Sequence, residues 1–546
     1  MRLAAGLAWV ALWSASVQAQ SLPIRDALQD GVLGLFPAQD FVQARGDCNC
    51  GTLKQGMWYF QDDLVALPKP GLPQASFSAS LDNMADLRQW AATPEARALA
   101  YPSLLWLGSP LVVDDVTMSA DGKQLVMSSG GAAAAFRVAP KIASNRSYYN
   151  DASVAYFAKR PLRLRGKTED DGGKPVFLAR TIWPNDFDID PAKLALDPPK
   201  DSAALTQFVQ AEAGGAQSAF STRLLWERRP GQPRQWRDKA VLGVMLNGAQ
   251  GDDDEAYGGH FAIATGKFGA DGDWSRWIVN NFYNLDSISE KGIVAASVPM
   301  DNYLMDLNSG QQYYRPSYML VAVLNDARTA VAYQGAVERS YNHFYRHDFV
   351  YRHAAANCAG ISIDVFKALG WNIPERGPSS WGKAIAAYFY LSAKDGSLES
   401  GRKIYDYLTE ETTRLLPAVA FDAAGQDLLD IVGGHATRPL GEFEKQLQRD
   451  VEAVYVVRIP QVPSSRAFGS NPVFSFGEYK DRVPQDHAQW KIVPVDARPF
   501  PRELRDGLAL TGRHESPVPW PIALIVLALA AIVSLGARLL YRKRKR

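Results

Sequence analysis

An uncharged apolar run near the C-terminus restricts the folds open to this chain more than any other feature. It extends from Trp520 to Ala537 without a charged side chain, and Leu539 to Tyr541 can lengthen it. At about 1.5 Å per helical residue, such a run nearly crosses a hydrocarbon core about 30 Å thick. We therefore expect a transmembrane helix over residues 520–541, with the long side chain of Arg538 reaching toward the membrane surface.

The residues that flank this run indicate its orientation. The tail 542–546 consists only of Arg and Lys, and such clusters beside a membrane span stay in the cytoplasm. Trp520 stands at the opposite end of the run, where an interfacial aromatic residue is typical. A buried core helix, the alternative interpretation, leaves the basic cluster unexplained. We predict a single-pass protein of the cell inner membrane whose body lies in the periplasm or otherwise outside the cytoplasm.

The N-terminus carries the pattern of a secretory signal. Arg2 precedes an uncharged apolar run over residues 3–15, and the small-residue pattern Val-Gln-Ala follows at residues 17–19. A positive charge, a short apolar run and small residues in this order are typical of a signal peptide. A first membrane span needs about 20 apolar residues, more than this run provides. We therefore expect residues 1–19 to be removed.

The charge balance of the body argues against a nucleic-acid partner. The chain holds 59 Lys and Arg and 58 Asp and Glu, and segments 1–19 and 520–546 contain seven of these bases and none of the acids. The remaining body therefore has 52 bases against 58 acids, a net charge of −6. A nucleic-acid-binding protein usually presents a basic face, for which this balance gives no sign. At about 500 residues the body exceeds one hydrophobic core, so two or three domains are expected.

The cysteine count limits disulfide formation in an exported chain. Cys48 and Cys50 stand two positions apart, and Cys358 is far from both. A disulfide between the first two would close a small strained ring, so a structural metal or two thiols are open alternatives. An odd count leaves one thiol free or paired between chains, and the spacing points to Cys358.

The apolar pattern predicts an α+β protein built of successive regions. Short alternating runs between Gly, Pro and Asp indicate a mainly β N-terminal region over residues 20–235. Residues 236–400 combine strand and helix patterns in a central domain, and residues 401–516 form a mixed C-terminal region. The transmembrane helix and the basic tail follow. Strands expected in the N-terminal region include 104–113, 124–127 and 135–138.

A strand that begins at His260 is the first candidate for chemistry. Residues 260–266 alternate between two faces, and Ala262, Ala264 and Gly266 share the face of the histidine. A face with so little bulk lets another element approach the imidazole closely. A merely structural strand more often has branched residues on both faces.

A second strand, residues 277–283, returns beside the first after a glycine-containing turn. In an antiparallel hairpin its far end lies beside His260. Asn280 or Asn281 can therefore orient the imidazole. The two are alternatives because the choice depends on the register of the hairpin.

The segment 351–361 places the remaining cysteine at the start of a helix. Asn357 is a good N-cap, and apolar residues recur at helical spacing from Ile361 to a stop at Gly370. Cys358 then occupies the first turn. The positive end of the helix dipole favours the thiolate there, and the thiolate is the nucleophilic form.

Each of these residues also has an ordinary structural interpretation. A cysteine at the start of an amphipathic helix is more often a small buried residue, and a histidine on a strand is usually structural. Three observations together favour Cys358 and His260 as a catalytic pair: the chain is exported, Cys358 is the cysteine without a disulfide partner in the sequence, and small residues share the face of His260. His343 and His347 have the spacing of zinc ligands, but no Glu intervenes and no third ligand is evident. We expect no metal and no cofactor.

These motifs resemble the circularly permuted branch of the papain-like superfamily, which includes NlpC-type cell-wall hydrolases and lecithin retinol acyltransferase. In its members the histidine strand precedes the cysteine helix, and the cysteine often follows an Asn with a Tyr a few residues upstream. Here His260 precedes Asn357-Cys358, and Tyr351 stands six residues before Asn357. The resemblance covers about residues 236–375 and implies a permuted papain-like α+β domain.

The resemblance also implies a reaction. A thiolate at Cys358 attacks an acyl carbon, His260 moves protons, and an Asn or another polar residue steers the imidazole. The resulting thioester is hydrolysed or passed to an acceptor. The backbone N–H at the start of the cysteine helix serves as one oxyanion donor. Tyr351 and Asn357 are the candidate substrate contacts, and a packed aromatic is the alternative role of Tyr351.

We therefore expect a membrane-tethered extracytoplasmic cysteine hydrolase or acyltransferase that acts on an amide or ester. Its substrate is a cell-wall peptide, an envelope protein or a lipid, and its other partner is the membrane, through the C-terminal helix. The alternative is a binding or scaffold protein of the cell envelope that keeps a papain-like shell without turnover. The reactivity of Cys358 distinguishes the two hypotheses.

Overall fold

The chain has a mixed α and β structure, as the sequence predicts. The computed structural model describes residues 22–45, 63–71, 82–97, 101–139, 149–248, 259–463 and 516–545, with interruptions at 30, 103, 131–132, 201–203, 211–218, 270, 285–292, 308–309, 314, 346–350, 353–355 and 379, and a few residues between 474 and 486. The predicted signal peptide and the pair Cys48 and Cys50 lie outside the described residues.

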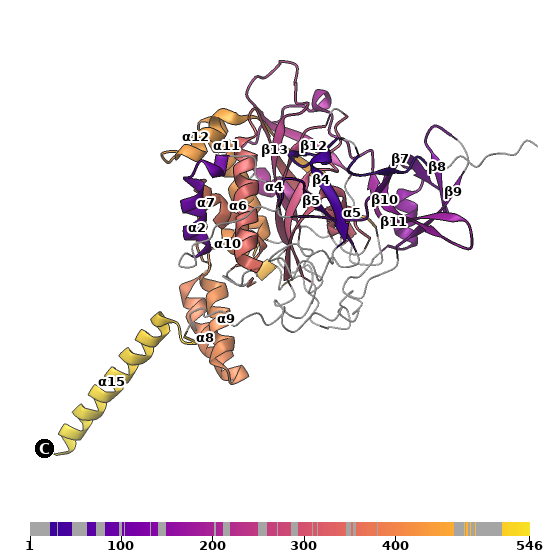
Figure 1. Ribbon diagram of the computed structural model, residues 1–546. Coiled ribbons are helices and arrows are strands. Elements are labelled where there is room, and N and C mark those ends of the chain that lie inside the picture. The colour runs from indigo at the N-terminus through magenta and orange to yellow at the C-terminus, as the bar shows by residue number, and fades with distance from the viewer. Residues whose placement is uncertain are drawn as a thin grey trace, which may run out of the picture.

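A ten-stranded sheet forms the centre of the body (Figure 1), in the order β12-β18-β17-β13-β14-β15-β16-β6-β5-β4. Its middle strands are nearly continuous apolar runs because both faces of the sheet are covered, and every residue of β13 and β17 is buried. The strands are β4 Phe41–Arg45, β5 Leu64–Pro68, β6 Leu105–Gly108, β12 Ser221–Glu227, β13 Ala240–Asn247, β14 His260–Lys267, β15 Ile278–Asn284, β16 Ile293–Pro299, β17 Ser317–Leu324 and β18 Val451–Ile459.

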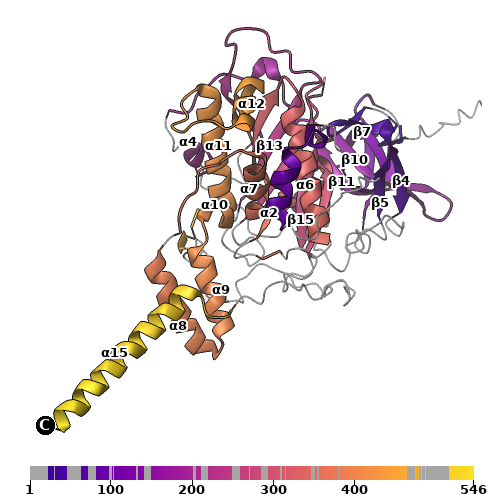
Figure 2. The same cartoon turned by 60° about the vertical axis from the view of Figure 1, so that its left-hand side comes forward.

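Helices cover one face of this sheet (Figure 2). Within this layer, α6 and α7 lie side by side on β14, and α11 covers β13 and β14. A Cβ atom on Gly425 of α11 would meet Leu320 of β17, so this helix sits close to the sheet. The helices of the layer are α2 Asn83–Ala91, α6 Arg328–Tyr345, α7 Cys358–Leu369, α10 Thr412–Leu415, α11 Pro417–Gly433 and α12 Glu442–Asp450.

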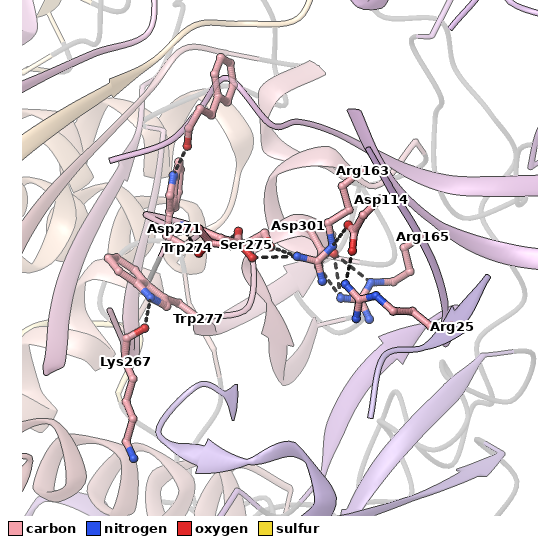
Figure 3. A network of polar contacts seen from close by, with 12 residues as sticks. Arg25, Asp114, Arg163, Arg165, Lys267, Asp271, Trp274, Ser275, Trp277 and Asp301 are labelled. Carbon is pink, nitrogen blue, oxygen red and sulfur yellow. Dashed lines mark hydrogen bonds and ion pairs between the residues drawn. The ribbon is translucent and has the colours of Figure 1, made fainter. Parts of the chain in front are cut away.

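A six-stranded sheet lies on the side of the large sheet opposite these helices (Figure 1), in the order β1-β7-β10-β11-β9-β8. Ion pairs join the two sheets. Arg165 of β10 pairs with the buried Asp301 at 2.8 Å (Figure 3), and Arg163 reaches the half-buried Asp273 at 2.9 Å. Its strands are β1 Arg25–Asp26, β7 Leu111–Met118, β8 Gln124–Met127, β9 Ala134–Val138, β10 Leu162–Asp170 and β11 Pro175–Pro184. Short elements near the sheets are β2 Val32–Leu33, β3 Phe36–Pro37, α3 Asp151–Phe157, α4 Ala204–Gln210 and α5 Met300–Met305.

Two helical segments lie outside the main core of the body. The hairpin of α8, Trp381–Asp395, and α9, Leu398–Thr409, lies beside the start of α15, Trp520–Arg544 (Figure 2). Within the described part of the chain, α15 is the one helix long and apolar enough to cross a membrane. It covers the span predicted at residues 520–541.

Two features of the large sheet depart from the sequence interpretation. Between β15 and β17 the chain forms β16 and the helix α5, which the sequence pattern did not reveal; the small residues at the centre of β16 have weak strand propensity. In addition, β4 to β6, β12 and β18 join the strands of the central region in one sheet. The predicted boundaries at residues 235 and 400 therefore do not separate independent sheets, because strand pairing joins segments that are far apart in the sequence.

Candidate active site

Local capping places the thiol of Cys358 at the first position of α7. The Oδ1 atom of Asn357 accepts a hydrogen bond from the backbone N–H of Gly360 at 2.9 Å. The helix ends at Gly370, whose φ of 100° is the left-handed conformation that glycine adopts without strain. Cys358 is a free thiol with 5% of its surface exposed.

The hairpin of β14 and β15 opens at the end where His260 lies. The two strands pair only from Ile263 to Thr265, opposite Ile278 to Asn280. Beyond this pairing, the Nε2 atom of His260 and the Oδ1 atom of Asn281 form a hydrogen bond. Because an amide oxygen only accepts, Nε2 carries the proton and Nδ1 keeps the lone pair of a base.

Asn280 faces the opposite side of the sheet. Its Nδ2 atom donates to Gln334 of α6 at 3.1 Å, and its Oδ1 atom accepts from Ser297 at 2.8 Å. Adjacent strand residues point to opposite faces, so one asparagine contacts the imidazole and the other contacts the helical layer. Asn281 is therefore the residue that can orient His260.

The sulfur of Cys358 lies against the strand that carries His260. The backbone N–H groups of Phe261, the residue that follows His260, and of Ala359 act on this sulfur, as does the hydroxyl of Tyr351, and each lowers the pKa of the thiol. The backbone N–H of Cys358 donates to the Tyr351 hydroxyl oxygen at 3.2 Å. Thus the thiol reaches the peptide group between His260 and Phe261 from the helical layer, whereas the imidazole lies on the other face of the sheet with Asn281 and Tyr303.

Burial determines the protonation of both groups. It raises the pKa of the Cys358 thiol, although the hydrogen bonds from Phe261, Tyr351 and Ala359 and the nearby Arg315 guanidinium oppose this. The thiolate expected from the helix dipole is therefore not the resting form. Burial, followed by the charge of Arg315, lowers the pKa of His260 to about 3, while the hydrogen bond with Asn281 acts in the opposite direction. At neutral pH the site holds a neutral thiol and a neutral imidazole.

Arg315 is a residue that the sequence analysis missed. Its side chain is buried, with 6% of the residue surface exposed, and its charge acts on both Cys358 and His260. It precedes β17 and belongs to no motif, so no pattern in the sequence pointed to it. A fixed cation in this position stabilises negative charge that develops on the sulfur or on a bound substrate.

The two candidate substrate contacts have structural roles in the unliganded site. Tyr351 is 5% exposed, its ring lies 5.5 Å from that of Phe282, and its hydroxyl contacts Cys358. Asn357 uses Oδ1 for the helix cap, and its Nδ2 atom donates to the Leu415 carbonyl oxygen at 2.9 Å. Both residues fix the position of the thiol.

His343, one of the two histidines with the spacing of zinc ligands, forms an ion pair instead. The Nε2 atom of His343 lies 2.8 Å from the Oδ2 atom of Asp86 on α2, which also pairs with Arg339. His347 lies outside the described residues. In the described part of the chain, no three His, Cys, Asp or Glu side chains gather as a metal site would require.

A cavity of about 560 Å³ lies away from the thiol, between the two sheets. Charged side chains and buried aromatic rings line it, among them Arg25, Arg163, Arg276, Asp273 and Trp183. Neither Cys358 nor His260 borders this cavity. Its polar walls include Arg163 and Asp273, whose ion pair belongs to the network that joins the sheets (Figure 3), so we assign the cavity a structural role.

Comparison with family models, curated proteins and solved structures gives no match to this chain.

Proposed function

We propose that the protein is a membrane-tethered cysteine hydrolase or acyltransferase with a permuted papain-like site, acting on an amide or ester outside the cytoplasm. The observation that carries this proposal is the meeting of Cys358 and the His260 strand at the Phe261 peptide, with the imidazole held by Asn281. A nucleophile, a base and a group that orients the base are the parts that thiol-dependent acyl transfer needs.

The protonation states favour a general-base mechanism over a preformed ion pair. As the substrate carbonyl approaches, Nδ1 of His260 takes the thiol proton and the sulfur of Cys358 bonds to the acyl carbon. The carbonyl oxygen becomes an oxyanion, and the backbone N–H of Cys358 becomes its donor when the substrate displaces the Tyr351 hydroxyl from that N–H. His260 then gives its proton to the departing amine or alcohol, which leaves a thioester.

Release of the acyl group completes the cycle. Water gives hydrolysis, and a second amine or alcohol gives acyl transfer; in either reaction His260 removes a proton from the attacking group and returns it to the sulfur. Arg315 favours formation of the nucleophile but opposes proton uptake by His260. Its charge favours the thiolate over the thiol and the neutral imidazole over the imidazolium.

The second candidate is a scaffold or binding protein of the cell envelope without turnover. The 5% exposure of Cys358 favours it, because a catalytic thiol must meet its substrate. Burial also raises the thiol pKa, as expected for a packed residue. On this alternative the contacts of His260 and Asn281 serve only to hold β14 and β15.

The experiment that decides between them is substrate profiling with the full chain. The wild type and Cys358→Ser are incubated in vesicles with labelled peptidoglycan, lipids and envelope proteins. Product formed by the wild type alone supports an enzyme and identifies its substrate class. Equal results with a folded Cys358→Ser variant support the scaffold.

The proposed location follows from α15 and the basic tail. Arg542, Lys543 and Arg544 end the helix, and Lys545 follows. These charges support a cytoplasmic C-terminus and an extracytoplasmic body. Protease added from outside the membrane should digest the body and leave a tag after Arg546 intact.

A further inference from the structure

The hairpin of α8 and α9 has an apolar cluster of its own. Ala384, Tyr388 and Tyr405 are its buried members within the hairpin, and the fourth is Ile522 of α15. The cluster shares no buried residue with the main core of the body. The hairpin therefore packs against the beginning of α15 and not against the main core.

Hydrogen bonds fix the chain that enters α15 to the same hairpin. The hydroxyl of Tyr388 donates to the carbonyl oxygen of Pro517 at 3.2 Å, and Nη1 of Arg402 donates to that of Ser516 at 2.8 Å. Figure 2 shows α15 starting beside α8 and α9. Wherever α15 enters the membrane, the hairpin must stand next to the entry point.

The hairpin exposes large apolar side chains. Trp381 is 56% exposed, Phe389 43%, Tyr390 66% and Leu398 50%. Outside α15, the described residues include seven exposed large apolar side chains, and these four fall within residues 381–398. Such a concentration on a soluble surface is unusual and marks a contact with a nonaqueous partner.

We propose that the second half of α8 and the tip of the hairpin lie in the interfacial zone of the bilayer that α15 enters. Ile522, two residues beyond the first residue of α15, belongs to one apolar cluster with Tyr388 of α8, so this part of the hairpin stands beside the entry point. Phe389 and Tyr390 follow Tyr388 directly. Tyr and other amphipathic aromatic residues favour the head-group level of a bilayer.

This placement rests on the membrane tether proposed above and orients the candidate site. The chain passes from α9 to α10 through Glu410 and Glu411, and Leu415 at the end of α10 accepts the hydrogen bond from Asn357. The helix cap beside Cys358 is thus joined to the base of the hairpin. The candidate site therefore lies at the end of the body that the hairpin connects to the membrane.

Photo-crosslinking in vesicles tests the hairpin contact. Benzoylphenylalanine replaces Tyr390 in the full chain, reconstituted in vesicles of phosphatidylcholine and phosphatidylglycerol, and adducts are identified by mass spectrometry. Matched variants carry the probe at Leu527 of α15, 64% exposed, and at Leu196 of the body, 38% exposed. The inference predicts lipid adducts at 390 and 527 and none at 196.

Each other outcome overturns the inference in a recognisable way. Lipid adducts at 527 without any at 390 show that the tether holds and that the hairpin stands away from the bilayer. Absence of lipid adducts at both positions contradicts the proposal that α15 enters the membrane. Adducts from 390 to another protein chain indicate that a second copy covers this surface. None of these results depends on turnover by Cys358, so failure of the enzymatic proposal is separately visible.

Discussion

Asn281 holds the imidazole of His260 through a hydrogen bond at the open end of the β14–β15 hairpin. The contact leaves the proton on Nε2 and the lone pair on Nδ1, the state that a general base requires. Asn280, one residue earlier, bonds instead to Gln334 and Ser297 on the other face. Substitutions of Asn281 and Asn280 can therefore be compared, since the first residue orients the imidazole and the second has a structural role.

Replacing Asn281 should therefore impair catalysis more than folding. One lost hydrogen bond of ~1 kcal/mol corresponds to about a fivefold fall in the rate of acyl transfer by Asn281→Ala. Asn280→Ala removes buried hydrogen bonds to Ser297 and Gln334, so it should lower the melting temperature more and the rate per folded molecule less. Steady-state rates and thermal melts of both variants give the comparison. A larger rate loss in Asn280→Ala would contradict the assignment.

The burial of His260 predicts a pH-dependent loss of stability. Its pKa is about 3 in the folded chain and about 6.5 in the unfolded chain, so below pH 6.5 the unfolded state binds more protons. The free energy of unfolding should fall as pH decreases from 6.5 toward 3, by at most about 1.4 kcal/mol per pH unit from this group. Above pH 6.5 the group should contribute no slope. Urea titrations of the wild type and His260→Gln at several pH values isolate the contribution of His260 to the pH dependence of the unfolding free energy. The same pH dependence in both chains would contradict the burial of the imidazole.

Arg315 should set the pH at which Cys358 ionises. Its guanidinium lowers the pKa of the thiol, so Arg315→Gln should move the alkylation of Cys358 to higher pH, and Arg315→Lys should restore part of the effect. The measurement is the rate of iodoacetamide modification against pH in a background where Cys48 and Cys50 are Ser. An unchanged profile in Arg315→Gln would show that the charge has no influence on the thiol.

The ion pair between the sheets should matter for stability alone. Arg165 and Asp301 are each 1% exposed and pair at 2.8 Å (Figure 3). Arg165→Met leaves a buried carboxylate without its cation, which typically costs about 3–5 kcal/mol of unfolding free energy. The double variant Arg165→Met, Asp301→Leu should lose less because no charge remains unpaired. Denaturant titration measures both, and a double variant less stable than the single one would contradict this account.

The helix and the strand of the candidate site could be predicted because their sequence signals lie within the elements themselves. The cap at Asn357 and the stop at Gly370 define α7, and the alternation from His260 defines β14. Each signal spans no more than 14 residues, so long-range packing is not needed to recognise it.

The remaining features depend on residues that meet only in the folded chain. The choice of Asn281 over Asn280 follows from where β14 and β15 separate, and the raised pKa of Cys358 follows from burial by other segments. The helix dipole, which the sequence does reveal, is the weaker influence on that thiol. The position of Arg315 depends in the same way on the fold.

Burst kinetics with an activated ester test the central claim, that Cys358 is a nucleophile served by His260. The full chain is mixed with excess p-nitrophenyl acetate at neutral pH, and nitrophenolate release and the mass of the Cys358 peptide are followed together. The account predicts a burst close to one equivalent per chain with an acetyl group on Cys358. It also predicts no burst with Cys358→Ser and a rate lower by about 10²–10⁴ with His260→Ala, the range of general-base contributions. A folded wild-type chain that gives no burst and no acetylated Cys358 would contradict it.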